Sequence, residues 1–153
     1  MAASDPVSAP RMPAASTDLL HGRELVPGAD GGRAGVWAEV RLPSYRSLPL
    51  SCVVDVEVRI DGGAPITSEA LALRLDGVTR RIAELRPLRD VVWWVLDVAE
   101  LFIPLEHPLA AGEHELSAWV DLLTPYATVG RSVHRHASVA TLRLAEAGAE
   151  AAR

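Results

Sequence analysis

The histidines are the residues of this chain best suited to bind a metal ion, and only two of them are closely spaced. His134 and His136 are separated by one residue in the segment VHRH, so in an extended strand both side chains point to the same face. A catalytic zinc site needs three converging protein ligands, and a structural site needs four. Because no third ligand lies at short spacing, we interpret His134 and His136 as polar residues at the start of a strand. We expect a structural role for His114 at the start of another strand. We expect no metal and no cofactor in this chain.

Other reactive patterns are also weak. Glu113 and Glu115 alternate onto one face, where surface charge is a more ordinary role than acid-base chemistry. The chain has no Gly-x-Ser-x-Gly nucleophile elbow, and its single cysteine, Cys52, lies among valines as a buried apolar side chain does. The glycines of DGGRAG do not lead from a strand into a helix, as a phosphate loop requires. We predict no catalytic residue, although a triad assembled from distant loops stays open.

The charge and hydropathy of the chain exclude two classes of partner. It carries 15 basic and 20 acidic residues, a net charge of −5, and the basic residues are scattered instead of forming the stripe that nucleic acid requires. No apolar run approaches the roughly 20 residues that span a bilayer. The N-terminus has no basic start followed by an apolar block, so it does not read as a secretory signal. We expect a cytoplasmic protein with neither nucleic acid nor membrane as its partner.

The strands that would position a functional site lie between two chain ends that lack a regular pattern of apolar residues. Residues 1–30 are rich in Ala, Ser, Pro and Gly, so we expect a loosely ordered N-terminal segment with ordered structure starting near Val36. Residues 146–153 are small and charged, which predicts a mobile tail. One β-domain over residues 31–145 is expected between them.

Within that domain the apolar residues alternate with period two, as in half-buried strands. Four segments carry the pattern most clearly, with these residues on the inner face: Val54, Val56, Val58 and Ile60; Leu71, Leu73 and Leu75; Leu116, Ala118, Val120 and Leu122; and, weakly, ASVATLRLAE. Asp76-Gly77 predicts a hairpin turn. VVWWVLDV and AELFI predict two more strands, and RIAELRPL predicts at most one short helical turn.

Seven to eight short strands punctuated by Gly and Pro predict an all-β fold, an antiparallel β-sandwich. Four tryptophans accompany a single phenylalanine. By alternation Trp119 faces outward, and the adjacent Trp93 and Trp94 point to opposite sides of their strand. An outward tryptophan serves either as a platform for a sugar ring or as an anchor in a protein interface. Both alternatives remain open, with a slight preference for the interface.

One stretch resembles a specific family. EVRLPSYRSLPLSCVVDVEVRIDG (Glu39–Gly62) has a strand, a Pro-x-Tyr-Arg turn and an alternating strand that ends in Asp-Gly. It resembles the small, or beta, subunits of bacterial C-glycoside deglycosidases. VVWWVLD, PLAAGEHELSAWVDL and TPY (Thr124–Tyr126) follow in the order expected for that family, so the resemblance covers roughly Val36 to Val129.

The resemblance implies that the chain is a non-catalytic subunit. Members of the family cleave the carbon-carbon bond between a 3-oxo-glucosyl unit and an aromatic aglycone, such as a flavonoid, by β-elimination. It implies a TIM-barrel alpha subunit, similar to sugar isomerases, that holds the acid-base residues and a divalent metal, often manganese. The small subunit is then expected to shape and stiffen the active site of its partner.

On this basis the segment LPSYRSLPLS becomes a candidate interface. Pro43 and Pro49 restrict the backbone of the turn, and Tyr and Arg are common interface anchors. We expect Tyr45, Arg46 and Pro43, together with Trp119 and Tyr126, to contact the alpha subunit. The alternative is that Tyr45 packs under its own sheet and Arg46 forms a local ion pair. Two further alternatives stay open, a carbohydrate-binding module and a metalloenzyme that uses His134 and His136.

Overall fold

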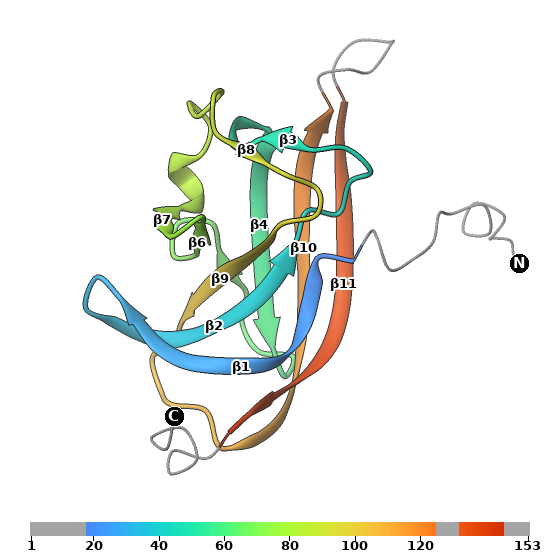
Figure 1. Ribbon diagram of the computed structural model, residues 1–153. Helices are drawn as coiled ribbons and strands as arrows, with labels where there is room; N and C mark the ends of the chain where they lie inside the picture. Colours follow the sequence, from blue (N-terminus) through green and yellow to red (C-terminus); the bar gives the residue numbers. More distant parts are fainter. Residues whose placement is uncertain (1–17, 125–131, 146–153) are drawn as a thin grey trace, which may run out of the picture.

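The computed structural model describes residues 18–124 and 132–145, and strands dominate this part of the chain (Figure 1). No α-helix occurs among these residues. The strands are β1 (Leu20–Asp30), β2 (Arg33–Arg41), β3 (Leu48–Pro49), β4 (Val53–Ile60), β5 (Ile66–Thr67), β6 (Ala72–Leu75), β7 (Val78–Arg81), β8 (Val92–Trp93), β9 (Val98–Pro104), β10 (Gly112–Thr124) and β11 (Ser132–Leu144). The all-β prediction is confirmed.

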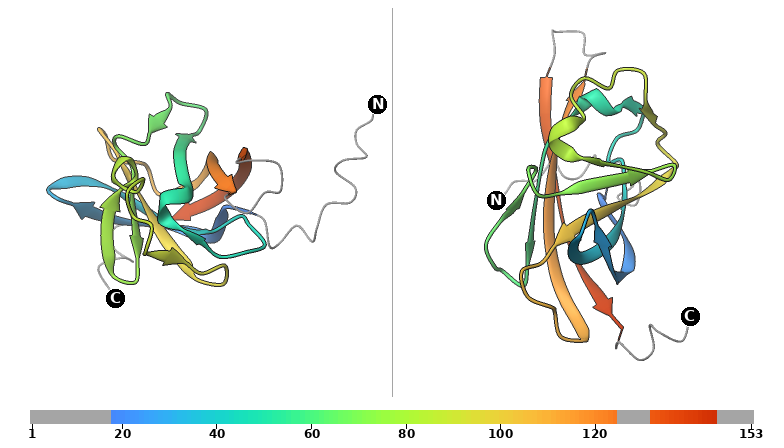
Figure 2. Two further views of the ribbon diagram at one scale, coloured as in Figure 1. Left: turned by 90° about the horizontal axis from the view of Figure 1, so that it is seen from above. Right: turned by 90° about the vertical axis from the view of Figure 1, so that its left-hand side faces the viewer.

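Nine of the strands form one curled sheet, so the predicted antiparallel sandwich is wrong in its architecture (Figures 1 and 2). Its order is β5-β4-β10-β11-β1-β2-β9-β6-β7, and β3 and β8 form a separate two-stranded sheet. Within each half, β5-β4-β10-β11 and β1-β2-β9-β6-β7, neighbouring strands are antiparallel. The halves therefore resemble the two layers of a sandwich, but they are connected.

The connection is a short parallel contact between β1 and β11. Glu24 pairs with Arg143 and Leu25 pairs with Leu144, and no other register pair joins these strands. The sheet is mixed because of this contact. Strand β11 spans 13 residues and stays paired with β10 to its last residue, while the opposite edge of its end pairs with β1. Period-two alternation in the sequence does not reveal which strands are neighbours, so one curled sheet and two separate layers give the same sequence pattern.

Period-two alternation of apolar residues predicts well which strand residues are buried. In β10, Leu116, Ala118, Val120 and Leu122 are buried, while Ser117, Trp119 and Asp121 face the other side. In β4 the prediction is wrong at one residue. The register between β4 and β10 shifts between Asp55 and Val53, which leaves Val54 as the extra residue of a β-bulge, and Val53 takes its place in the core.

Two turns show how glycine sets the hairpins. Asp76 and Gly77 both have positive φ, 55° and 79°, as the predicted two-residue hairpin turn requires. The segment around Gly31 and Gly32, predicted as a loop, instead forms a second hairpin of this kind, since Asp30 pairs with Arg33 and both glycines have positive φ.

Strand β1 lies within the segment predicted to be loosely ordered, so the boundary at residue 30 is wrong. The strand carries only two buried leucines, Leu20 and Leu25, and its register shifts between them. The irregular spacing and the internal Pro27 remove the period-two pattern that would reveal a strand. The predicted tail, residues 146–153, lies outside the described residues.

The shorter elements differ from prediction at two places. VVWWVLDV yields only the two-residue strand β8, followed by a turn in which the Asp97 N–H donates to the Trp94 carbonyl over 2.9 Å. Two 3₁₀ turns occur among the described residues instead of one at most: Ile82–Glu84, within the predicted helical segment, and Leu50–Cys52. Strand β9 ends at Pro104, as predicted.

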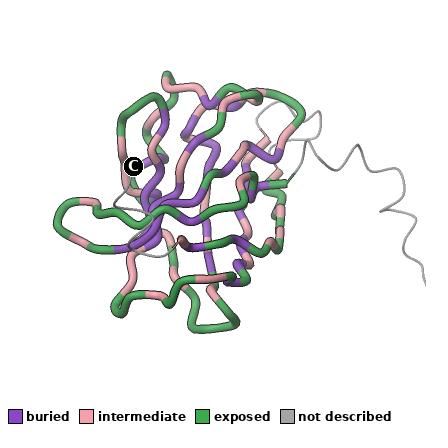
Figure 3. Tube along the Cα trace, turned by 60° about the horizontal axis from the view of Figure 1, so that its bottom comes forward, coloured by how far each residue is buried: buried purple, intermediate pink, exposed green. Residues whose placement is uncertain are grey.

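The core fills the inside of the curl, where buried positions from both halves of the sheet face one another (Figure 3). The segment after β2 also contributes, because Leu42, Leu48 of β3 and Leu50 are fully buried in the same cluster as β10 residues such as Val120. Cys52 is buried among them, as predicted. Among the described residues, no helix is long and apolar enough to cross a membrane.

Candidate interaction surface

The loop between β2 and β3 displays Tyr45 to solvent. Tyr45 is 75% exposed, whereas Pro43, two residues earlier, is buried. The loop is held by local hydrogen bonds: the Ser44 N–H donates to the Leu42 carbonyl over 2.8 Å, and the Arg46 N–H donates to Ser44 Oγ over 3.2 Å. Pro43 therefore acts as the anchored base of the turn and Tyr45 lies at its tip. The alternative that Tyr45 packs under its own sheet is wrong.

Arg46 lies beside the Tyr45 ring at the tip of the same loop. Its guanidinium carbon is 5.9 Å from the ring centroid, within the range of a cation-π contact. Arg46 is exposed. The pair therefore offers an aromatic ring and a positive charge together, a combination enriched in protein interfaces.

A second loop lies next to the first and adds two exposed apolar side chains. Trp94 is 59% exposed and Leu96 is 75% exposed. The Val95 N–H donates to Ser47 Oγ over 2.8 Å, and β3 pairs with β8 directly before this contact. Figures 1 and 2 show the two loops side by side at the same end of the molecule. We refer to Tyr45, Arg46, Trp94 and Leu96 as the two-loop surface.

Buried neighbours fix the base of the second loop. Trp93 is buried, and its indole N–H donates to the Asp97 carbonyl over 3.1 Å. This bond closes residues 93–97 into a compact turn. The sequence correctly places Trp93 and Trp94 on opposite sides, because one is buried and the other exposed. It does not reveal Leu96, since that residue is exposed by the turn and not by strand alternation.

Trp119 lies on the outer face of β10, as alternation predicts, but one side of its ring is covered. The Arg135 guanidinium carbon is 3.5 Å from the ring centroid. Arg135 is held there by Asp121, with its Nε 2.8 Å from Oδ1 and its Nη2 3.1 Å from Oδ2. An arginine stacked in this way occupies the ring face that a sugar would need. Trp119 is therefore a poor sugar platform.

The predicted interface residues do not all lie together. Leu42 and Leu48, which flank Tyr45 along the chain, pack in the same core cluster as Ala118 and Val120, so this loop covers the inner face of β10. Trp119 points to the opposite face. Tyr126 lies outside the described residues. Tyr45, Arg46 and Pro43 form one surface and Trp119 belongs to another.

The histidines of β11 share one face, as their spacing predicts. His134 pairs with Leu122 and His136 with Val120, so both point to the inner side of the sheet. Burial and the neighbouring His134 lower the pKa of His136, which keeps its ring neutral near pH 7. Over residues 18–124 and 132–145, no group of three or more His, Cys, Asp or Glu side chains could hold a metal ion.

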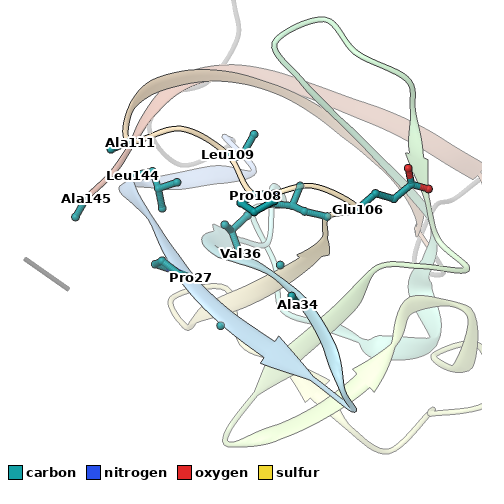
Figure 4. A pocket seen from close by; sticks show the side chains of 12 residues that line it. Pro27, Ala34, Val36, Glu106, Pro108, Leu109, Ala111, Leu144 and Ala145 are labelled. Atoms are coloured by element: carbon teal, nitrogen blue, oxygen red, sulfur yellow. The ribbon is translucent and has the colours of Figure 1, made fainter. Parts of the chain in front are cut away.

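An apolar groove lies at the other end of the molecule, near the end of β11. Its volume is about 470 Å³. Pro27 and Val36 from the β1–β2 hairpin face Pro108 and Leu109 from the β9–β10 loop, with Leu144 between them (Figure 4). Glu106 is the charged residue of the lining, and its carboxylate points away from the other side chains in Figure 4. The groove offers apolar contact and no acid-base pair.

With this geometry in view, comparison with known proteins identifies the family. The family model described as C-glycoside deglycosidase beta subunit matches residues 25–126. This chain belongs to that family. The match includes the whole two-loop surface and strands β2 to β10, so the family resemblance seen in Glu39–Gly62 extends over most of the curled sheet.

Individual relatives agree with the family model. A C-glycoside deglycosidase beta subunit of Microbacterium trichothecenolyticum is 39% identical over 108 residues, 70% of this chain and 79% of the relative. A protein of the same name from Arthrobacter globiformis is 42% identical over 79 residues, 52% of this chain and 59% of the relative. A 3'-dehydrocarminate deglycosidase beta subunit of Microbacterium sp. is 37% identical over 90 residues, 59% of this chain and 67% of the relative.

Proposed function

We propose that this chain is the non-catalytic beta subunit of a heteromeric C-glycoside deglycosidase that cleaves 3-oxo-C-glucosides of aromatic aglycones. Its expected partner is a TIM-barrel alpha subunit that carries the acid-base residues and a divalent metal, manganese by resemblance. The chain stabilises that subunit and shapes the rim of its active site. The observation that carries the proposal is membership of a family whose relatives are named as beta subunits.

The site geometry supports a binding role. Four of the eight large apolar side chains that are exposed among the described residues, Tyr45, Trp94, Leu96 and Val98, lie in or next to the two loops. Exposed apolar side chains that gather in one place, with arginine beside them, are typical of protein interfaces. Glu113 and Glu115, the acidic pair considered for catalysis, are both exposed on the outer face of β10. They pair with Arg143 and Thr141 across the hairpin.

The proposed reaction explains why a second subunit would help. A base removes the proton from C2, next to the 3-oxo group, and the bond between C1 and the aglycone carbon breaks. A C1–C2 double bond forms, and the aglycone carbon takes up a proton. The metal expected in the alpha subunit would stabilise the intermediate enolate. Such electrostatic stabilisation is strongest where water is excluded, so a rigid neighbour that closes the rim of the pocket would increase the rate.

The two-loop surface is the part of this chain that we expect to meet the alpha subunit. Tyr45 and Arg46 are held at the tip of a loop whose base is buried, so little conformational freedom is lost on binding. Trp119 and Tyr126 remain predicted contacts. The opposite orientation of Trp119 means that it would contact the partner through a separate patch.

The experiment is co-expression with the sugar-isomerase-like barrel expected from a neighbouring gene. We expect a stable complex on gel filtration and cleavage of a 3-oxo-C-glucoside by the complex, with release of the free aglycone measured by chromatography. The isolated chain should be inactive. Cleavage by the isolated chain, or full activity of the barrel protein without it, would contradict the proposal.

A second candidate function rests on Trp94, whose exposed ring is the best stacking platform among the described tryptophans. A carbohydrate-binding module predicts that the isolated chain binds a sugar in calorimetry and that Trp94→Ala abolishes this binding. The subunit proposal predicts no measurable sugar affinity in the isolated chain, so the same titration separates the two functions.

A further inference from the structure

Strand β11 is paired along its whole length on one side, while on the other side the part of the chain that the structure describes pairs with it only at one end. Its register with β10 is continuous from Ser132 opposite Thr124 to Leu144 opposite Gly112. On the other side, backbone pairing with β1 begins only at Arg143. Between Ser132 and Ala137 none of the residues that the structure describes pairs with the outer edge through its backbone. At about 3.4 Å per residue this stretch is roughly 20 Å long. From Ser138 onward β1 lies beside this edge, because the Leu20 N–H donates to Ser138 Oγ over 3.3 Å.

The two terminal edges of the sheet are protected, and this contrast makes the edge of β11 unusual. Strand β5 has two residues. Strand β7 has four and carries Arg80 and Arg81. Short strands and charged side chains are the common means by which proteins prevent their edges from pairing with other chains. The edge of β11 is neither short nor interrupted by proline or a bulge.

The side chains of β11 leave its edge accessible. Val133 and Val139 are 52% and 65% exposed on the outer face. Arg135, between them, is held over Trp119 by Asp121 of β10, so its charge is directed back across the sheet and away from the edge. His136, whose pKa is lowered, adds no charge at neutral pH. Among residues 18–124 and 132–145, nothing therefore pairs with the outward N–H and C=O groups of 132–137, which lie beside an exposed valine.

We propose that the outer edge of β11, between Ser132 and Ala137, docks an extended segment of the alpha subunit by strand addition. The inference rests on the proposed function, because it takes the alpha subunit as the partner. The free backbone groups determine the chemistry of the occupant: an extended main chain that completes the ladder, with apolar side chains placed beside Val133 and Val139.

The alpha subunit is a better occupant than a second copy of this chain. The family is named for one subunit of a larger enzyme, so a different chain is expected to be present. The hairpin of β10 and β11 also carries Trp119, which the sequence assigns to the interface, and Trp119 pairs with Ala137 of the open edge. Strand addition at β11 would bring the partner to the Trp119 side of the sheet, which the two-loop surface does not reach.

Amide hydrogen exchange by NMR tests the proposal directly, on the full chain free and in complex with the barrel protein. In the free chain, amides of 132–137 should alternate between slow exchange, where they bond to β10, and fast exchange at the open edge. In the complex the fast amides should slow at least tenfold. Docking through side chains alone would leave them fast and would overturn the inference.

A double variant, Val133→Glu with Val139→Glu, provides a second measurement. Both residues are exposed, so the free chain should keep its melting temperature, while affinity for the barrel protein falls at least tenfold. Val78→Glu, on the protected edge strand β7, is the matched control and should bind like the unmodified chain. Unchanged affinity of the double variant would contradict the inference.

The outcomes separate this inference from the proposed function. If the unmodified chain forms no complex with the barrel protein, the proposed function fails. If the complex forms but the exchange pattern and the double variant are unaffected, only strand addition at β11 fails. Slow edge amides in the free chain would also overturn it: dependence on concentration would indicate a second copy, and independence would indicate pairing with another part of the same chain.

Discussion

The Nδ1 atom of His114 lies 2.7 Å from the Oδ2 atom of Asp61, which joins the start of β10 to the turn after β4. The other ring nitrogen, Nε2, lies 2.6 Å from the Ala110 carbonyl oxygen. A carbonyl and an ionised carboxylate only accept hydrogen bonds, so both ring nitrogens must donate, and the ring must be the imidazolium. The hydrogen bond to Asp61 is the main cause that raises the pKa of His114, and the same contact lowers that of Asp61.

The stability of the protein should therefore depend on pH through this pair. His114 has a raised pKa in the folded state, so its contribution is complete below its ordinary value of 6.5 and is lost as the pH rises through the folded value. The contribution of Asp61 is present above its ordinary value of 3.8 and is lost as the pH falls through the lowered one. The free energy of unfolding measured in urea should therefore include the largest contribution from this pair between pH 3.8 and pH 6.5.

Asp61→Asn is the matched variant for that prediction. Asp61 has a φ of 52°, a conformation that asparagine also tolerates, and the amide oxygen can still accept the Glu115 N–H that Asp61 Oδ1 accepts over 2.9 Å. Only the charged contact with His114 is lost. We expect a loss of about 1 kcal/mol at pH 6 and a weaker fall in stability from pH 6 to pH 9. An unchanged pH profile would show that Asp61 does not hold the proton on His114.

Gly35 should be intolerant of substitution, although its φ is not in the left-handed region. A Cβ at this position would lie 2.2 Å from the Ile103 carbonyl oxygen and 2.8 Å from both Phe102 and the Pro104 Cα. Two of these contacts are backbone atoms of the paired strand β9, which cannot rotate away. Gly35→Ala should destabilise the fold by about 3 kcal/mol in urea unfolding.

Gly63→Ala is the control for that substitution. Its Cβ would meet one backbone oxygen, that of Ile60, at 3.1 Å, in an exposed turn. A small shift of the turn relieves such a contact, so a loss below about 1 kcal/mol is expected. Equal losses at the two positions would mean that the approach of β2 to β9 is not what excludes a side chain at residue 35.

The fold could be predicted from the sequence where one face of a strand is buried along its whole length. Strands β10 and β6 meet this condition, so alternation identifies them, and the Asp76-Gly77 turn identifies the hairpin that joins β6 to β7. Strand β1 fails it, because it has two buried leucines separated by a register shift. The curl of the sheet could not be predicted from the sequence either, since it depends on two residue pairs between strands that are more than 100 positions apart in the chain.

The candidate site is predictable to the same extent. Pro43 and Pro49 indicate a rigid turn, and Tyr45 is displayed as expected. Leu96 is missed because its exposure depends on a turn fixed by Ser47, which lies nearly fifty residues earlier in the chain. A bond of that range leaves no local pattern in the sequence. The separation of Trp119 from Tyr45 is likewise a property of the folded sheet.

Arg135 should control both the Trp119 ring and the charge of the outer face. Asp121 lies directly opposite Asp55 in the β4–β10 register, and like charges so placed repel each other unless neutralised. Arg135→Gln should expose the ring and leave this repulsion. We expect stronger quenching of tryptophan fluorescence by acrylamide and a melting temperature that rises with added salt more than that of the unmodified chain. Identical salt dependence would show that Arg135 does not neutralise this pair.

Removal of the two-loop side chains should weaken binding of the alpha subunit without weakening the fold. Tyr45, Trp94 and Leu96 are mostly exposed in the free chain, so alanine at each position removes little internal packing and should leave the melting temperature almost unchanged. If they anchor the partner, Tyr45→Ala and Trp94→Ala should each weaken the complex about 30-fold, as interface anchors worth about 2 kcal/mol do. Calorimetry with the barrel protein measures this loss.

Val26→Ala is the matched control for the two-loop variants, because Val26 is also an exposed apolar residue but lies on β1, away from both loops. It should bind like the unmodified chain. If Tyr45→Ala and Trp94→Ala also bind normally while the complex stays intact, the partner must be held elsewhere on this chain. The outer side of β10 and β11, with Trp119 and the open edge, would then be the surface to test, since it lies on the opposite face of the sheet from the Tyr45 loop.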